Sequence, residues 1–166
     1  MKNLLNPSLL DESKMKEIRA AFENAQPCKH VAVPNFLNEE LANTLYNNFP
    51  KLEALNVKRK SINENKSEEY HLERYHPAFN ELRDFMNSPE MYAWISKVTG
   101  IEDLRSTYDS LGSGVHQGGP GSFVDVHVDI NMNPVANLHR RINVLIYLNK
   151  IGKMNTVEHW NFGIKM

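Results

Sequence analysis

The sequence contains a single cysteine, Cys28, among its 166 residues. One cysteine excludes an intramolecular disulfide, and it excludes any zinc or iron–sulfur site that needs several cysteines from one chain. Unpaired cysteine is typical of proteins that stay in a reducing compartment. We therefore expect a cytoplasmic protein.

Long hydrophobic runs and an excess of one charge are also missing. The longest apolar run, 142–148, is interrupted by Asn143 and is too short to cross a bilayer. Residues 1–11 lack the continuous apolar stretch of a signal peptide. The 19 Lys and Arg residues nearly balance the 20 Asp and Glu residues, so no net field attracts polyanions. We expect neither nucleic acid nor a membrane as a partner.

The length and the 41% hydrophobic content predict one domain over residues 1–166. Its front part, 1–100, has helical periodicity, whereas its back part, 101–166, is rich in strand patterns. Four segments combine apolar residues at helical spacing with capping or stop residues: 8–27, 38–50, 79–85 and 88–100. Residues 30–33 predict a short strand, and residues 51–76 predict a surface excursion or a weak strand.

The back part begins with a glycine-rich connector, because five of the eight glycines lie between Gly112 and Gly121. Segments 121–130 and 138–149 then have the apolar patterns of strands. Residues i and i+2 of a strand point to the same face, so His127 and Asp129 are expected to converge. An imidazole and a carboxylate are two of the three ligands in the 2-His-1-carboxylate facial triad that binds Fe(II).

These features resemble the Fe(II)- and 2-oxoglutarate-dependent dioxygenases, in particular the prolyl 4-hydroxylase-like branch. The resemblance rests on residues 121–129 with His127 and Asp129, on residues 140–149, and more weakly on residues 27–50. It implies an α+β fold in which N-terminal helices precede a double-stranded β-helix, or jelly roll. It also implies that His127 and Asp129 bind Fe(II), with 2-oxoglutarate as cosubstrate and ascorbate as a candidate cofactor. The expected activity is hydroxylation of a C–H bond in a small molecule or a protein.

The sequence departs from this family after residue 149. The family pattern has a second histidine on a later strand, followed by an Arg or Lys that pairs with 2-oxoglutarate. The only histidine beyond residue 149 is His159, and its surroundings match the strand that precedes the second histidine better. We therefore expect a C-terminally incomplete, partial jelly roll, no assignable catalytic residue and low catalytic competence.

Other candidate residues favour structural interpretations. His139 and His159 are expected to be structural or surface residues, and Arg140 and Arg141 are expected to be solvated although either can bind an anion. Asn143 and Tyr147 share a strand face with Arg141, and that face is expected to line a pocket or to cap the barrel mouth.

Three functional hypotheses follow. The first is a hydroxylase of unknown substrate, and the second is a non-catalytic binding module or inactive fragment on a jelly-roll remnant. The third is a homodimer in which two chains complete one barrel and share a metal ligand. Unpaired strand edges in an incomplete roll also predict self-association.

Overall fold

The computed structural model describes residues 4–106, 113–148 and 160–165, and for residues 113 and 160–165 it describes the backbone. The chain forms two compact units. The first comprises Met1–Thr44 and Glu81–Ser106, and the second comprises Leu45–Asn80 and Thr107–Met166. Compact units can still fold together, so the single domain expected over residues 1–166 stays a prediction.

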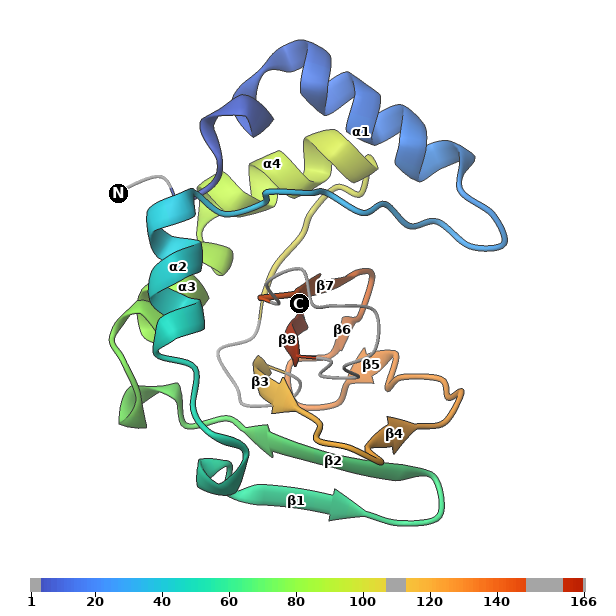
Figure 1. Ribbon diagram of the computed structural model, residues 1–166. Helices are drawn as coiled ribbons and strands as arrows, with labels where there is room; N and C mark the ends of the chain where they lie inside the picture. The colour runs from blue at the N-terminus through green and yellow to red at the C-terminus, as the bar shows by residue number, and fades with distance from the viewer. Residues whose placement is uncertain (1–3, 107–112, 149–159, 166) are drawn as a thin grey trace. The chain divides into compact units, whose positions relative to one another are not determined.

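The first unit is helical. It contains a 3-10 turn η1 (Pro7–Leu10), helix α1 (Glu12–Asn24) and helix α4 (Pro89–Thr99), which lies against α1 (Figure 1). Helices α2 (Glu39–Asn47) and α3 (Ala78–Met86) each pass from one unit into the other. Helices α1, α2 and α4 lie within the segments that the sequence predicts, and α3 extends the predicted segment 79–85 by one residue at each end.

Helix boundaries follow the capping residues. Asn38 accepts a hydrogen bond from the Leu41 backbone N–H at 2.9 Å, and Ser88 accepts one from the Met91 N–H at 3.2 Å. Gly100 ends α4 in the left-handed conformation, with φ of 72°. The predicted core face of α4 is confirmed, since these four side chains are buried: Met91, Trp94, Ile95 and Val98.

The strand predicted at residues 30–33 is wrong. These residues have no strand partner among the described residues, and a turn at Pro34 and Asn35 follows them. Asn35 has φ of 53°, a left-handed conformation that redirects the chain. Pairing occurs instead at an isolated bridge between Leu5 and Leu37.

The second unit contains an antiparallel sheet. Five strands pair in the order β1 (Val57–Lys60), β2 (Glu64–Glu69), β3 (Ser113–Gln117), β8 (Trp160–Lys165) and β7 (Asn143–Ile146). Strand β4 (Phe123–Val124) also pairs with β2, while β5 (Met132–Asn133) and β6 (Leu138–His139) form a separate hairpin. The short 3-10 turns η2 (Leu52–Ala54) and η3 (Leu72–Arg74) precede β1 and follow β2 (Figure 1).

The mixture of four helices with antiparallel strands confirms the α+β class. The segment 51–76, expected as an excursion or a weak strand, supplies β1 and β2, so strands also occur before residue 100. Strand β2 was hard to predict because the residues buried at its end are polar: Ser67, Glu68 and Glu69.

The register assigns the polar residues of β2 to two faces. Lys66 pairs with Arg59, and Glu68 pairs with His116, so these four residues share one face. The opposite face carries Val115, which is completely buried and pairs with Glu69. A buried charged residue on each face of one strand makes the hydrogen bonding of β2 decisive for its stability.

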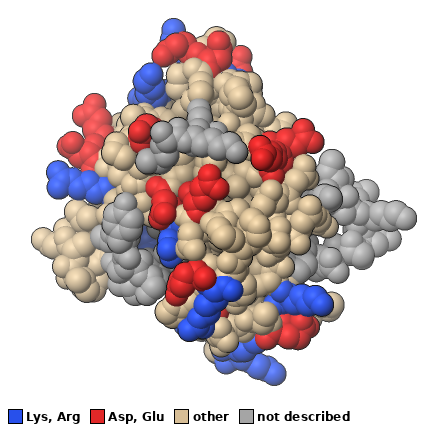
Figure 2. Space-filling model, turned by 90° about the vertical axis from the view of Figure 1, so that its left-hand side faces the viewer, with Lys and Arg blue, Asp and Glu red and all other residues tan. Residues whose placement is uncertain are grey.

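No described helix is long and apolar enough to cross a membrane. On the face of the molecule shown in Figure 2, acidic and basic side chains are interspersed, as the near-zero net charge suggests.

Candidate functional site

The segment that carries His127 and Asp129 is extended, but most of it is not a strand. Only Phe123–Val124 pairs with β2, so the strand predicted over 121–130 is wrong beyond residue 124. The Asp125 backbone N–H donates to the Asn63 carbonyl at 2.8 Å, and none of residues 125–131 is assigned to a strand. Val126 and Val128 are almost fully exposed there.

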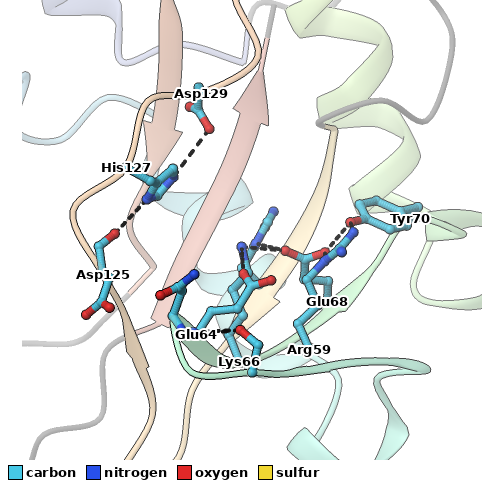
Figure 3. Close-up of polar contacts among 11 residues, drawn as sticks. Arg59, Glu64, Lys66, Glu68, Tyr70, Asp125, His127 and Asp129 are labelled. Atoms are coloured by element: carbon cyan, nitrogen blue, oxygen red, sulfur yellow. Dashed lines mark hydrogen bonds and ion pairs between the residues drawn. The ribbon is translucent and has the colours of Figure 1, made fainter.

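His127 and Asp129 nevertheless converge as expected. His127 Nε2 lies 3.4 Å from Asp129 Oδ1, and Figure 3 shows the two side chains pointing toward one another. An extended backbone alone is enough to place residues i and i+2 on one side, even without pairing to a neighbouring strand. The His127 side chain is 54% exposed and the Asp129 side chain 27%, so a ligand can reach both.

A backbone contact fixes the orientation of the imidazole. His127 Nδ1 lies 2.7 Å from the Asp125 carbonyl oxygen (Figure 3), and a carbonyl can only accept. Nδ1 therefore carries the proton, which leaves Nε2 of the neutral ring with a free lone pair. That lone pair and Asp129 Oδ1 are both acceptors, so their close approach requires a proton or a cation between them.

Two side chains contact the other oxygen of Asp129, one from the first residue of β7 and one from the residue after β6. Asn143 Nδ2 donates to Asp129 Oδ2 at 2.8 Å, and Arg140 Nη1 lies 3.7 Å from the same oxygen. Contacts of this kind orient a metal-binding carboxylate. Asn143 thus lies at the candidate site, whereas Tyr147 is 62% exposed and Arg141 is also exposed.

The separation of the two donor atoms suits a small divalent cation. Ligands about 2.1 Å from an ion lie about 3.0 Å apart in octahedral and about 3.4 Å apart in tetrahedral geometry. A neutral nitrogen with a hard carboxylate oxygen is a donor set that Fe(II) and related ions accept. Within residues 4–106 and 114–148, no third His, Cys, Asp or Glu completes a cluster. His139 is exposed on β6, and His159 lies outside the described residues.

A second polar cluster, which the sequence did not reveal, surrounds Glu68 on β2. Glu68 is 2% exposed, and four side chains contact its carboxylate. Arg59 Nε lies 2.7 Å and Lys66 Nζ 2.8 Å from its oxygens, His116 Nδ1 lies 3.3 Å away, and the Tyr70 hydroxyl donates a short hydrogen bond (Figure 3). We call these five residues the Glu68 cluster.

The cluster strongly favours the ionised carboxylate. Burial raises the pKa of Glu68, but the hydrogen bonds from His116, Arg59, Lys66 and Tyr70 outweigh it and hold that pKa far below its ordinary value. The hydrogen bonds of Arg59 with Glu68 and with Tyr70 raise the pKa of Arg59. Because the donors saturate the carboxylate, Glu68 serves as an internal anchor of the sheet.

Glu68 and His116 were missed because their contacts depend on strand pairing. The available signal was the alternation of Glu64, Lys66 and Glu68, in which opposite charges recur at the spacing of one strand face. That alternation lies in the segment interpreted as a surface excursion. His116 came from the glycine-rich connector, where a strand was not expected.

Comparisons with known proteins found no match, either among protein-family models or among curated proteins. The resemblance of residues 121–149 to the Fe(II)- and 2-oxoglutarate-dependent dioxygenases therefore stays a prediction that depends on the residues themselves.

Proposed function

We propose that this chain is a hydroxylase-like domain of the Fe(II)- and 2-oxoglutarate-dependent dioxygenase type, with His127 and Asp129 as metal ligands. The observation that carries the proposal is the 3.4 Å approach of His127 Nε2 to Asp129 Oδ1, with the ring oriented by the Asp125 carbonyl. In this proposal a cation takes the place of the proton that the two converging acceptors otherwise share. The combination of helices with antiparallel strands is compatible with a partial jelly roll.

Each residue has a defined task in this proposal. His127 supplies a neutral nitrogen, and Asp129 supplies a negative charge that offsets part of the charge of the ion. Asn143 keeps Asp129 Oδ2 occupied, so that Oδ1 faces the ion. When bound, Fe(II) with 2-oxoglutarate supplies the oxidising power for hydroxylation of a small-molecule or protein substrate.

Calorimetric titration of the purified chain with Mn(II), an air-stable substitute for Fe(II), tests the proposal. We expect micromolar binding, and we expect His127→Ala to weaken it at least about tenfold, since even residues behind the ligands contribute that much. His139→Ala is the matched control, because His139 is exposed on β6 and is expected to leave the affinity unchanged.

Failure of the wild-type chain to bind Mn(II) would overturn the metal site and favour the non-catalytic binding module. Equal weakening by His127→Ala and His139→Ala would show adventitious binding to surface histidines. A stoichiometry of one ion per two chains would instead support a homodimer with a shared ligand.

Asn143→Ala is expected to weaken Mn(II) binding about tenfold, the usual effect of removing a residue that orients a metal ligand. The loss arises because Asp129 Oδ2 then lacks its 2.8 Å donor and the carboxylate can rotate. Tyr147→Phe is the control, since Tyr147 is expected on the same side of the strand but is largely exposed. Unchanged affinity in Asn143→Ala would mean that Arg140 alone positions Asp129.

A further inference from the structure

The extended segment after β4 carries a row of exposed apolar side chains. Val126 is fully exposed, Val128 is 91% exposed and Ile130 is 68% exposed. Alternate residues of an extended backbone point to one side, and the side chains between these three, His127 and Asp129, converge on the other. One side of the segment is therefore apolar and open to solvent.

Three residues of this segment make no backbone hydrogen bond within the described part of the chain. The Asp125 N–H makes the last backbone bond to the β1–β2 hairpin, with the Asn63 carbonyl, and the chain bends at Val126 directly after it. Val126, Val128 and Ile130 then have no backbone partner among the described residues. Unpaired N–H and C=O groups of an extended segment are a template for a strand from another chain.

The open edge of the sheet at β1 differs from this segment in its charge. Strand β1 ends the strand order and carries three exposed basic residues, Lys58, Arg59 and Lys60. Charged side chains, Lys above all, oppose the pairing of an edge strand with another chain. Residues 126–130 contain neither Lys nor Arg, so a strand can add there without approaching a basic side chain of the segment.

The sequence of residues 125–131 is complementary to a second copy of itself. In an antiparallel pair centred on Val128, Val126 lies opposite the partner's Ile130, and His127 lies opposite the partner's Asp129. Cross-strand pairs of β-branched residues and of opposite charges stabilise a sheet. Both kinds of pair occur twice, because each copy contributes each member once.

The registers on either side of this one oppose carboxylates. Centring the pair on His127 would place Asp125 opposite the partner's Asp129, and centring it on Asp129 would place the two copies of that residue opposite each other. Like charges directly opposite one another destabilise an antiparallel pair. Charge complementarity therefore favours the register centred on Val128 over these two.

We propose that residues 125–131 pair as an antiparallel strand with the same residues of a second copy of this chain and so form a symmetric homodimer. The same segment serves both copies, as a twofold axis requires. Seven residues of strand span only about 23 Å, and stable complexes bury about 800 Å² per partner, so we expect a dimer that forms as the chain concentration rises. The pairing needs no metal ion and does not depend on the proposed function.

Light scattering of the purified chain at increasing concentration, with a metal chelator present, tests the proposal. We expect the measured mass to rise from the 19.1 kDa of one chain toward twice that value. Val128→Lys is expected to raise the dissociation constant of the dimer at least about tenfold, because it places two like charges opposite each other at the twofold axis. Val135→Lys is the matched control, since Val135 is 84% exposed but lies outside the paired segment.

Two outcomes of this measurement would overturn the proposal. One is a wild-type chain whose mass stays at that of a monomer at every concentration. The other is a dimer that Val128→Lys and Val135→Lys weaken equally, which would place the contact elsewhere. Because both valines are largely exposed, neither substitution is expected to unfold the chain, and circular dichroism checks this.

Disulfide trapping tests the register itself. Directly opposed residues of antiparallel strands have Cα atoms about 4.5–5.5 Å apart, within the range that a disulfide spans. In a chain whose exposed native thiol is removed by Cys28→Ser, we expect Val128→Cys to form a covalent dimer with oxidised glutathione. Val135→Cys in the same background is expected to stay monomeric, and equal cross-linking of the two variants would overturn the proposed register.

Discussion

Replacing Glu68 with glutamine is expected to lower the free energy of unfolding of the sheet by about 3 kcal/mol, the lower end of the range for breaking a buried ion pair. The amide keeps the size of the side chain but loses the charge. Its NH2 group also faces donors from Arg59, Lys66, Tyr70 and His116, so at least one donor loses its acceptor. We expect the lower end of the range because the Arg59 side chain is 46% exposed and can regain water.

Urea unfolding followed by far-UV circular dichroism measures this effect, and hydrogen exchange of the β2 and β3 amides assigns it to the sheet. Glu64→Gln is the matched control on the same strand face. Glu64 is 28% exposed and has one ion pair in the cluster, at 3.2 Å to Lys66, so its loss is expected to cost less than about 1 kcal/mol. Similar small losses in both variants would mean that the Glu68 contacts contribute no more than surface ion pairs.

The helices could be predicted from the sequence because their signals are local. Asn38, Ser88 and Gly100 mark ends of α2 and α4 through bonds within a few residues of themselves. The apolar spacing of α3 and α4 correctly identified their buried faces. No distant part of the chain is needed to interpret such signals.

The strands were predicted less well because pairing joins residues far apart in the sequence. Residues 30–33 have the apolar content of a strand but no partner in the part of the chain that the structure describes, whereas β2 is polar and pairs with both β1 and β3. Strand propensity describes how well a residue fits a half-buried sheet, and the partners decide whether that sheet exists. The same reason explains why pairing after Val124 is lost despite the alternating pattern of residues 125–130.

The candidate site was predictable in part. The convergence of His127 and Asp129 follows from their i, i+2 spacing, which holds for any extended backbone. The Asp125 carbonyl that orients the ring and the different burial of Arg140 and Arg141 depend on the path of the chain. Spacing therefore identified the two candidate ligands, but not the contacts that prepare them for an ion.

Two carboxylates of β2 also make stability depend on acid pH. Burial raises the pKa of Glu69 as well, but the hydrogen bonds from the His71 N–H, Asn56, the Tyr70 N–H and Tyr75 outweigh it, so its pKa is lowered like that of Glu68. In the unfolded chain both groups return to their ordinary value near 4.5. The unfolded state therefore binds more protons than the folded state once the pH falls below that value.

The stability from these groups is present above about pH 4.5 and is lost as the pH falls below it. Each carboxylate that stays ionised only in the folded state contributes a slope of up to about 1.4 kcal/mol per pH unit. Urea unfolding at several pH values between 4.5 and 3 measures this slope. Glu69→Gln is expected to reduce this slope, because of the two carboxylates only Glu68 then stays ionised in the folded state. An unchanged slope in that variant would show that other acidic groups control acid unfolding.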